Sequence, residues 1–322
     1  MTDALAPTPT SAPAPDRARI VATKGHGTQN DFVLLDDRDG TLVLVPARVR
    51  QLCERRAGVG ADGVIRLVAT EHVEDAPAAA RAARWFMDYR NADGSVAQMC
   101  GNGVRVFAAY AQRLGLWDPV TGPLDVGTRA GLRTVAAVAP EVGDGPWFEV
   151  GMGPVTLPAG PGALADGGDA HVDVAGLSVT RPGLSVDVGN PHTVVVLADG
   201  ADLARADLTT APGVVPVPPE GTNVELVVPL GEEVGPDGRP RGHVRMRVHE
   251  RGVGETRSCG TGAVAAAAAV RAWGGPQAPD VWLVDVPGGT VRVTLRADGH
   301  AELAGPALLV AELDVDLAAL PA

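Results

Sequence analysis

Two cysteines stand in the same short pattern at distant points of the sequence. Cys100 lies in Met-Cys-Gly-Asn-Gly and Cys259 in Ser-Cys-Gly-Thr-Gly, and an apolar or alanine-rich run follows each. A run of this kind predicts that each cysteine stands just ahead of a helix, with Asn102 and Thr261 as the N-cap residues. A helix N-terminus favours negative charge, so both thiols are expected to be acidic. Each could act as a base or as an acid.

The similarity between the two segments extends upstream of the cysteines. Asn30 lies 70 residues before the first cysteine, and Asn190 lies 69 residues before the second. Asn91 and Glu250 lie nine residues before the first and the second cysteine, respectively. These matching distances predict a duplicated domain, with one cysteine contributed by each copy.

The elements that must position the cysteines are mainly strands. Short apolar or β-branched runs, including residues 41–45, are broken by Gly, Pro and Asp and predict strands. Pro46 is expected to open a helix that Gly58 closes, with Cys53 buried on its apolar face. Residues 71–84 and 160–169 have the composition of loops.

The predicted fold class is α+β. It has two pseudo-symmetric duplicated domains, each a mixed or antiparallel sheet wrapped around a central helix. We expect a disordered tail at 1–16, an N-terminal domain at 17–150 to which 306–322 return, and a C-terminal domain at 151–305.

Composition narrows the classes of function. The net charge of -12 argues against a nucleic-acid or anionic-membrane partner. No signal peptide and no apolar run near the length of a membrane span is visible, and three cysteines without Cys-x-x-Cys fit a cytoplasmic protein. Lys24 is the only lysine, and hence the only candidate for the Schiff base of a pyridoxal phosphate enzyme.

Paired cysteines allow four interpretations. A redox disulfide normally comes from one Cys-x-x-Cys loop, and a zinc site would need recognised spacing among His192, His249 and Glu250. A lone nucleophilic cysteine leaves the second motif unexplained. The fourth interpretation places two acid/base groups on opposite faces of one carbon, with both helix N-termini binding its carboxylate. It predicts an amino-acid racemase or epimerase that works without pyridoxal phosphate and without a metal.

The motifs resemble the signatures of the diaminopimelate epimerase family over nearly the whole chain from Lys24. The matching segments are Gly-x-x-Asn-Asp-Phe at 27–32, Asn-Ala-Asp-Gly-Ser at 91–95, Cys-Gly-Asn-Gly at 100–103, Gly-Asn-Pro-His at 189–192, Glu-Arg-Gly-x-Gly-Glu-Thr at 250–256 and Cys-Gly-Thr-Gly at 259–262. The resemblance implies interconversion of LL- and meso-diaminopimelate, on the route to lysine and cell-wall precursors, by a cofactor-independent isomerase.

The resemblance also implies roles for individual residues. Cys100 and Cys259 would be the acid/base pair, and His192 and Glu250 would orient the thiols or the amino group. Residues expected to bind polar groups of the substrate are Asn30, Asn91, Asn190, Asn223, Glu250 and Arg251, and those expected to hold the reacting carboxylate are Gly101, Asn102, Gly260 and Thr261. We also expect a homodimer.

Two positions depart from the family pattern, and two other functions stay open. Gly63 replaces a usual Gln, and Gln29 replaces a usual Gly. A proline or hydroxyproline racemase of the same fold is the second interpretation, although that family usually has His at the position of Asn102. The third is a non-catalytic amino-acid-binding protein whose thiols sense oxidation, which activity on diaminopimelate would separate.

Overall fold

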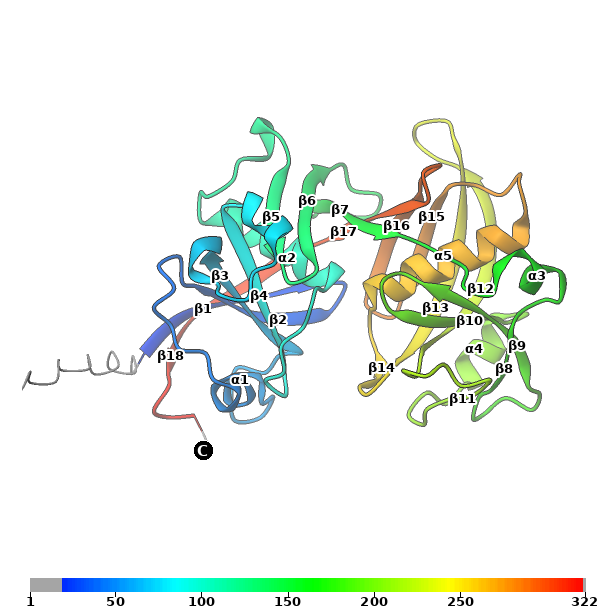
Figure 1. The fold of residues 1–322 in the computed structure, drawn as a ribbon, viewed down its shortest axis with the longest axis horizontal. Coiled ribbons are helices and arrows are strands. Elements are labelled where there is room, and N and C mark those ends of the chain that lie inside the picture. Colours follow the sequence, from blue (N-terminus) through cyan, green and yellow to red (C-terminus); the bar gives the residue numbers. More distant parts are fainter. Residues whose placement is uncertain (1–18, 321–322) are drawn as a thin grey trace, which may run out of the picture.

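The computed structural model describes residues 19–320, so the tail predicted at 1–16 lies outside the described residues. The chain forms two lobes that lie side by side (Figure 1). Strands in each lobe surround one long helix, α2 (Gly101–Arg113) in the first lobe and α5 (Gly260–Gly274) in the second. The predicted α+β class with two pseudo-symmetric domains is confirmed.

The two lobes repeat one strand topology. In the first, β2–β3 and β4–β5 are parallel pairs, while β1–β2, β3–β4, β5–β6 and β6–β7 are antiparallel. The second lobe has the same order of pairings over β9, β10, β12, β13, β15, β16 and β17. The first set is β1 (Arg19–Gly27), β2 (Asn30–Asp36), β3 (Gly63–Ala69), β4 (Trp85–Asn91), β5 (Leu124–Thr128), β6 (Gly131–Val138) and β7 (Trp147–Pro154). The second is β9 (Arg181–Asp187), β10 (Pro191–Val196), β12 (Asn223–Val234), β13 (Pro240–Glu250), β15 (Val281–Val286), β16 (Gly289–Leu295) and β17 (His300–Pro306).

The two lobes are joined by strand pairing between them and by chain segments that cross from one lobe to the other. β7 pairs antiparallel with its repeat β17, so hydrogen bonds run from one sheet into the other. After β7 the chain continues into β8 (Ala170–Asp173), which pairs with β9, and after β17 it continues into β18 (Leu308–Asp316), which pairs with β1. We keep the domain boundaries at 17–150 with 306–322, and at 151–305, as a proposal.

The two central helices are buried for reasons that their sequences make clear. Every residue of α2 from Gly101 to Ala111 is buried, and larger side chains such as Phe107 fill the first lobe. α5 instead buries a run of alanines, which favour the helix and let the surrounding strands approach closely. Both helices begin where the lobes meet and contact each other there.

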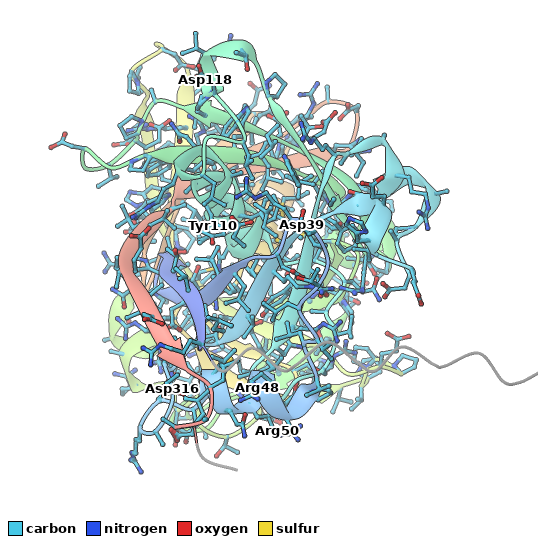
Figure 2. All side chains as sticks on the ribbon, turned by 90° about the vertical axis from the view of Figure 1, so that its left-hand side faces the viewer. Asp39, Arg48, Arg50, Tyr110, Asp118 and Asp316 are labelled. Atoms are coloured by element: carbon cyan, nitrogen blue, oxygen red, sulfur yellow. The ribbon has the colours of Figure 1, made fainter. Side chains whose placement is uncertain are left out.

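The helix α1 (Pro46–Cys53) begins as predicted but ends earlier. Pro46 occupies its first turn, and Val49, Leu52 and Cys53 are buried, which confirms the structural position of Cys53. The helix stops before Gly58 because the Glu54 carboxylate accepts hydrogen bonds from the amides of Arg56 and Ala57. These bonds compete with the backbone hydrogen bonds that would continue the helix. Figure 2 shows Arg48 of α1 and Asp316 of β18 on one face, and Arg48 donates to the carbonyl of Leu317, 2.9 Å away.

Several local predictions were wrong. Residues 41–45 form no strand, because the Asp37 carboxylate accepts from the amides of Thr41 and Leu42 at 2.9 and 3.1 Å. The expected loops contain short helices, η1 (Thr70–His72) and η2 (Ala78–Ala82) in one and α3 (Gly160–Ala165) in the other. The remaining elements are η3 (Pro119–Thr121), α4 (Gly200–Arg205), β11 (Gly213–Val215) and β14 (Gly254–Thr256). Within residues 19–320, no helix is long and apolar enough to cross a membrane.

Candidate active site

Each cysteine is itself the N-cap of its helix. The backbone of Cys100 and Cys259 is extended, and the sulfur of each accepts from the amide three residues later, at Gly103 and Gly262, across 3.4 Å. The prediction that Asn102 and Thr261 would be the N-caps was therefore wrong by two residues. Because the helical backbone already starts at the residue after each cysteine, the asparagine and the threonine belong to the first turns.

The N-termini of α2 and α5 meet. A methyl group added at Gly260 would lie 3.5 Å from the Cα of Gly101 and 3.7 Å from the amide nitrogen of Asn102. One added at either glycine would also lie 3.0 Å from Leu303 Cδ2. Two glycines thus let the positive ends of two helices approach each other, which is an arrangement suited to one carboxylate.

Hydrogen bonds tie the two cysteine loops together across the lobes. Asn102 Nδ2 lies 3.2 Å from both the carbonyl oxygen and the hydroxyl of Ser258, the residue before Cys259. The hydroxyls of Ser258 and Thr28 are 2.6 Å apart. Asn30 Oδ1 accepts from Asn102 at 3.3 Å and from the Cys100 thiol at 3.5 Å.

A tight turn between β1 and β2 positions Asn30. Thr28 and Gln29 both have positive φ, 50° and 62°, as the two central residues of a two-residue hairpin of type I′ require. Gln29 keeps this conformation without being glycine, and its side-chain oxygen accepts from Arg257 in the other lobe. The departure at Gln29 therefore preserves the turn and adds a contact. Asn30 Nδ2 is held in turn by Asp62, 2.8 Å away.

Polar side chains from β10 and β12 surround the Cys259 side. His192 pairs in register with Asn223, and its Nε2 lies 3.1 Å from Asn190 Oδ1. Its Nδ1 lies 2.7 Å from the carboxylate of Glu225, and both side chains are fully buried. Asn223 Oδ1 accepts from the amide of Arg251 at 2.9 Å, which fixes the end of β13.

Glu250, the last residue of β13, lies near both thiols. It accepts from Thr256 and interacts electrostatically with Cys100 and with Cys259. Thr261 Oγ1 lies 3.5 Å from the Cys259 sulfur. Burial raises the pKa of the Glu250 carboxyl, while its hydrogen bonds with Thr256 and Cys259 oppose the rise.

The expected acidity of the two thiols was wrong. Burial raises the pKa of Cys100 to about 11, with Glu250 adding to the effect and the Gly103 amide opposing it. Burial also raises the pKa of Cys259 well above its usual value, and Glu250 and Glu225 raise it further. The helix N-termini do favour the thiolates, but the loss of water outweighs them.

Two residues predicted to bind the substrate have polar partners other than the cysteines. Asn91, at the end of β4, donates to Ser95 at 3.0 Å, and the exposed guanidinium of Arg251 contacts Glu220. Gly63 pairs with Asn91 in register, and a Cβ there would lie 2.4 Å from the Arg90 carbonyl oxygen. This backbone leaves no room for the Gln that is usual at that position.

The structure adds four residues that the sequence interpretation did not assign to the site: Asp62, Arg105, Glu225 and Ser258. A signal for two of them was available, because Arg105 and Glu225 are single charges inside otherwise apolar runs that are predicted to be buried. Lys24 forms an ion pair with Asp31 at 2.6 Å. In the part of the chain that is described, no cluster of three or more His, Cys, Asp or Glu could hold a metal ion.

Comparison with known proteins agrees with this geometry. The sequence model of a family described as diaminopimelate epimerase matches residues 22–158 and 184–310. The diaminopimelate epimerase of Streptomyces coelicolor is 48% identical over 307 residues, covering 93% of this chain and 96% of the relative.

Two solved structures share the fold. One is a phenazine biosynthesis protein of the PhzF family from Bacillus anthracis, with a TM-score of 0.62, 16% identity, and coverage of 92% of this chain and 99% of that one. The other is a hydroxyproline epimerase from Agrobacterium vitis, with a TM-score of 0.57, 16% identity, and coverage of 93% and 91%. At such identities the similarity establishes the fold alone.

Proposed function

The chain belongs to the diaminopimelate epimerase family, and on that basis we propose that Cys100 and Cys259 are the two acid/base groups of its reaction. It is an isomerase whose substrate is a small molecule, and it interconverts LL- and meso-diaminopimelate. That interconversion inverts one carbon centre. The observation that carries the assignment is that each cysteine caps one of two helices whose N-termini meet.

In this mechanism one cysteine reacts as a thiolate and the other as a thiol. The thiolate takes the α-proton from one face of the carbon, and the thiol gives its proton to the opposite face. Product and substrate then differ only in configuration, while the two sulfurs have exchanged their protonation states. A proton must return through solvent or a neighbouring group before the next turnover in the same direction. No pyridoxal phosphate and no metal takes part.

The proposed place for the reacting carboxylate is between the two helix N-termini. Gly101 and Asn102 would offer amides from α2, and Gly260 and Thr261 from α5. When the α-proton leaves, negative charge builds on this carboxylate, so preorganised amides stabilise the transition state more than the ground state. The close approach of Gly260 to Gly101 supports this placement.

The remaining polar residues would bind the amino groups and the distant carboxylate. Proposed for this role are Asn30, Asn91, Asn190, Asn223, Glu250 and Arg251. Asn30 and Asn190 are already oriented by Cys100 and His192, respectively, which supports direct roles. His192 and Glu250 would orient the thiol of Cys259 or the amino group, since Glu250 interacts with that thiol.

The direct test is to incubate the purified protein with LL-diaminopimelate and separate the stereoisomers over time. Accumulation of meso-diaminopimelate to equilibrium, without added pyridoxal phosphate and in the presence of a chelator, is the expected result. Proline and hydroxyproline serve as comparison substrates. Inversion of either of those, with diaminopimelate unchanged, would refute the assignment.

We also propose a cytoplasmic homodimer. A reducing compartment keeps the two site thiols free, and Cys100 and Cys259 are free in the structure. Val21 on β1 and Val310 on the adjacent β18 are 71% and 57% exposed, and these strands lie on the face shown in Figure 2. Light scattering should give twice the chain mass, and Val310→Asp should reduce it toward the monomer.

A further inference from the structure

The two thiols occupy equivalent places in the repeated fold but have unlike surroundings. Gly103 and Gly262 are the third residues after the two cysteines. A Cβ at Gly103 would meet Ile65 Cδ1 at 3.2 Å and Phe32 Cζ at 3.6 Å, whereas one at Gly262 would meet Glu225 Oε1 at 2.7 Å. A methyl group at this glycine position would therefore meet an apolar pair in one lobe and a carboxylate in the other.

The strand registers explain this difference. Phe32 and Ile65 belong to the parallel pair β2–β3, and His192 and Glu225 hold the corresponding positions in β10–β12. The apolar pair below Cys100 is thus replaced, below Cys259, by a hydrogen-bonded imidazole and carboxylate. Glu225 Oε2 is buried and has no hydrogen-bond partner among the described residues.

A buried cation lies on the Cys100 side. Arg105, five residues after Cys100, is fully buried and donates to the carbonyl of Gly101 at 3.1 Å and to Asn102 Oδ1 at 2.8 Å. None of the described carboxylates forms an ion pair with it, Cys100 is the one described charged group that favours its ionised form, and its Nε lacks a hydrogen-bond partner. The equivalent residue five positions after Cys259 is the apolar Val264.

Glycines make room for this guanidinium. A Cβ at Gly27 would lie 3.2 Å from an Arg105 terminal nitrogen, and one at Gly305 would lie 3.3 Å from its Cζ. An uncompensated buried charge is costly, so an anion close to Arg105 lowers the energy of the folded protein. The Cys100 thiolate is such an anion: Arg105 favours its ionised form electrostatically and binds the first two residues of the helix that Cys100 caps.

We propose that Arg105 and Glu225 make the two thiols unequal, so that Cys100 ionises before Cys259 in the ligand-free enzyme. Both act through the thiols as positioning residues, and the inference rests on the proposed roles of Cys100 and Cys259. Opposite charge near a thiol favours its ionised form and like charge opposes it. When Glu225 is ionised, its pair with His192 carries no net positive charge.

The other groups near the thiols do not cancel this difference. The N-cap amides contact both sulfurs at the same 3.4 Å. Glu250 opposes ionisation of both thiols. Tyr89 faces Cys100, and burial raises its pKa well above its usual value, so it stays neutral. Cys259 is 6% exposed and Cys100 is less buried, which favours ionisation of Cys100 further.

The test measures the ionisation of each thiol without substrate. Cys53→Ala protein, kept reduced, is treated briefly with iodoacetamide at a series of pH values, and alkylation at Cys100 and Cys259 is quantified by peptide mass spectrometry at low conversion. The midpoint of each pH profile reports ionisation, since the thiolate is the nucleophile, and accessibility changes only its amplitude. The midpoint for Cys100 should be lower by at least about one pH unit, a tenfold difference in the ionisation constant.

Two variants separate tuning of the thiols from general structural damage. Arg105→Met should raise the Cys100 midpoint alone, while Arg105→Lys keeps the charge and changes it less. Glu225→Gln should lower the Cys259 midpoint alone, and it keeps an acceptor for His192. If Arg105→Met does not fold, the midpoints measured for the parent protein and for Glu225→Gln still test the inference.

Three results would overturn the inference: equal midpoints in the parent, a lower midpoint for Cys259, or a Glu225→Gln variant in which the Cys259 midpoint stays in place. None of them bears on whether diaminopimelate is epimerised, so the inference and the proposed function can fail separately.

Discussion

Asn102 donates to Ser258 across the boundary between the lobes, with 3.2 Å from its Nδ2 to both oxygens of the serine. Each of these residues lies next to a thiol in sequence, two positions after Cys100 and one before Cys259. The loop that holds one thiol is therefore bonded to the loop that holds the other. The distance between the two sulfurs is constrained from both lobes, as a reaction at two faces of one carbon requires.

Replacing either site cysteine by alanine should stop epimerisation. Inversion needs a base on one face and an acid on the other, so Cys100→Ala and Cys259→Ala should each lose at least about a thousandfold in kcat. Cys53→Ala is the matched control, because Cys53 is buried in α1 and should leave turnover nearly unchanged. Near-parental inversion by either site variant would exclude the two-thiol mechanism.

Isotope exchange should show the direction of proton flow. Starting from one isomer in D2O, the first turnovers should place solvent deuterium mainly in the product, because the acid that protonates the product is not the base that took the substrate proton. Recovered substrate should stay largely protiated. Mass spectrometry of the separated isomers measures both. Return of the original hydrogen to the product would indicate a single base serving both faces.

Mild oxidant should join Cys100 to Cys259 and inactivate the enzyme reversibly. The two cysteines cap helices whose first residues lie so close that a methyl group added at Gly260 would contact Gly101, so we expect a thiolate on one cysteine to reach the sulfur of the other. Peptide mapping under non-reducing conditions should find this disulfide, and dithiothreitol should restore activity. Inactive protein with both thiols free would contradict the shared site.

A matched pair of glycine substitutions should affect activity unequally. Gly262→Ala would bring a methyl group to 2.7 Å from Glu225 Oε1 and 3.3 Å from the Cys259 sulfur, so the carboxylate or the thiol must move. Displacement by about 1 Å can cost about a hundredfold in rate, and we expect a loss of that order in kcat. Gly103→Ala would bring its methyl group closest to the flexible end of Ile65, at 3.2 Å, and into ordinary contact with Cys100 Cβ and Phe32 Cζ, so it should lose less than about tenfold. Equal losses would show that the Glu225 contact does not matter.

Asp88 should be essential for stability rather than chemistry. Its carboxylate is fully buried in β4 and pairs with Arg66, Arg90 and Arg129 at 2.9, 3.0 and 2.7 Å. Asp88→Ala would remove the carboxylate that the three arginines share. Arg66 and Arg129 keep Asp37 and Asp75 as partners, but Arg90 keeps none among the described carboxylates, so we expect a cost of about 3 kcal/mol in the free energy of unfolding. Urea unfolding measures it. Asp237→Ala, in an exposed pair, should change stability by less than about 0.5 kcal/mol.

The pKa of Asp88 determines how its contribution to stability should change with pH. Burial alone would raise the pKa of Asp88, but its three arginine partners outweigh burial and lower it. A lowered pKa means that the stabilisation is fully present above the ordinary pKa near 3.8 and is lost as pH falls below it. The difference in unfolding free energy between the parent and Asp88→Ala should therefore shrink in acid. A difference that does not change between neutral pH and acid would refute this origin.

The duplicated domain could be predicted from the sequence because its signals lie in short segments. The distances from Asn30 and Asn190 to their cysteines, and the helix propensity after each cysteine, are properties of short segments. Effects that depend on contacts between distant residues could not be predicted from such segments. Residues 41–45 do not form the expected strand, because the Asp37 carboxylate accepts hydrogen bonds from the amides of Thr41 and Leu42. Burial reverses the expected acidity of Cys100, and Glu250 of the other lobe raises its pKa further.

The pairing of β1 with β18 has a consequence for how the chain is made. β1 precedes every other described strand, and its antiparallel partner β18 follows all the strands of the second lobe, so the first lobe cannot complete its sheet until the second lobe has left the ribosome. Domains usually fold as they emerge, N-terminal first. Here β1 keeps an unpaired strand edge until β18 has been synthesised, so the two lobes must complete their folding together. An unpaired edge promotes aggregation, which argues for chaperone protection during synthesis.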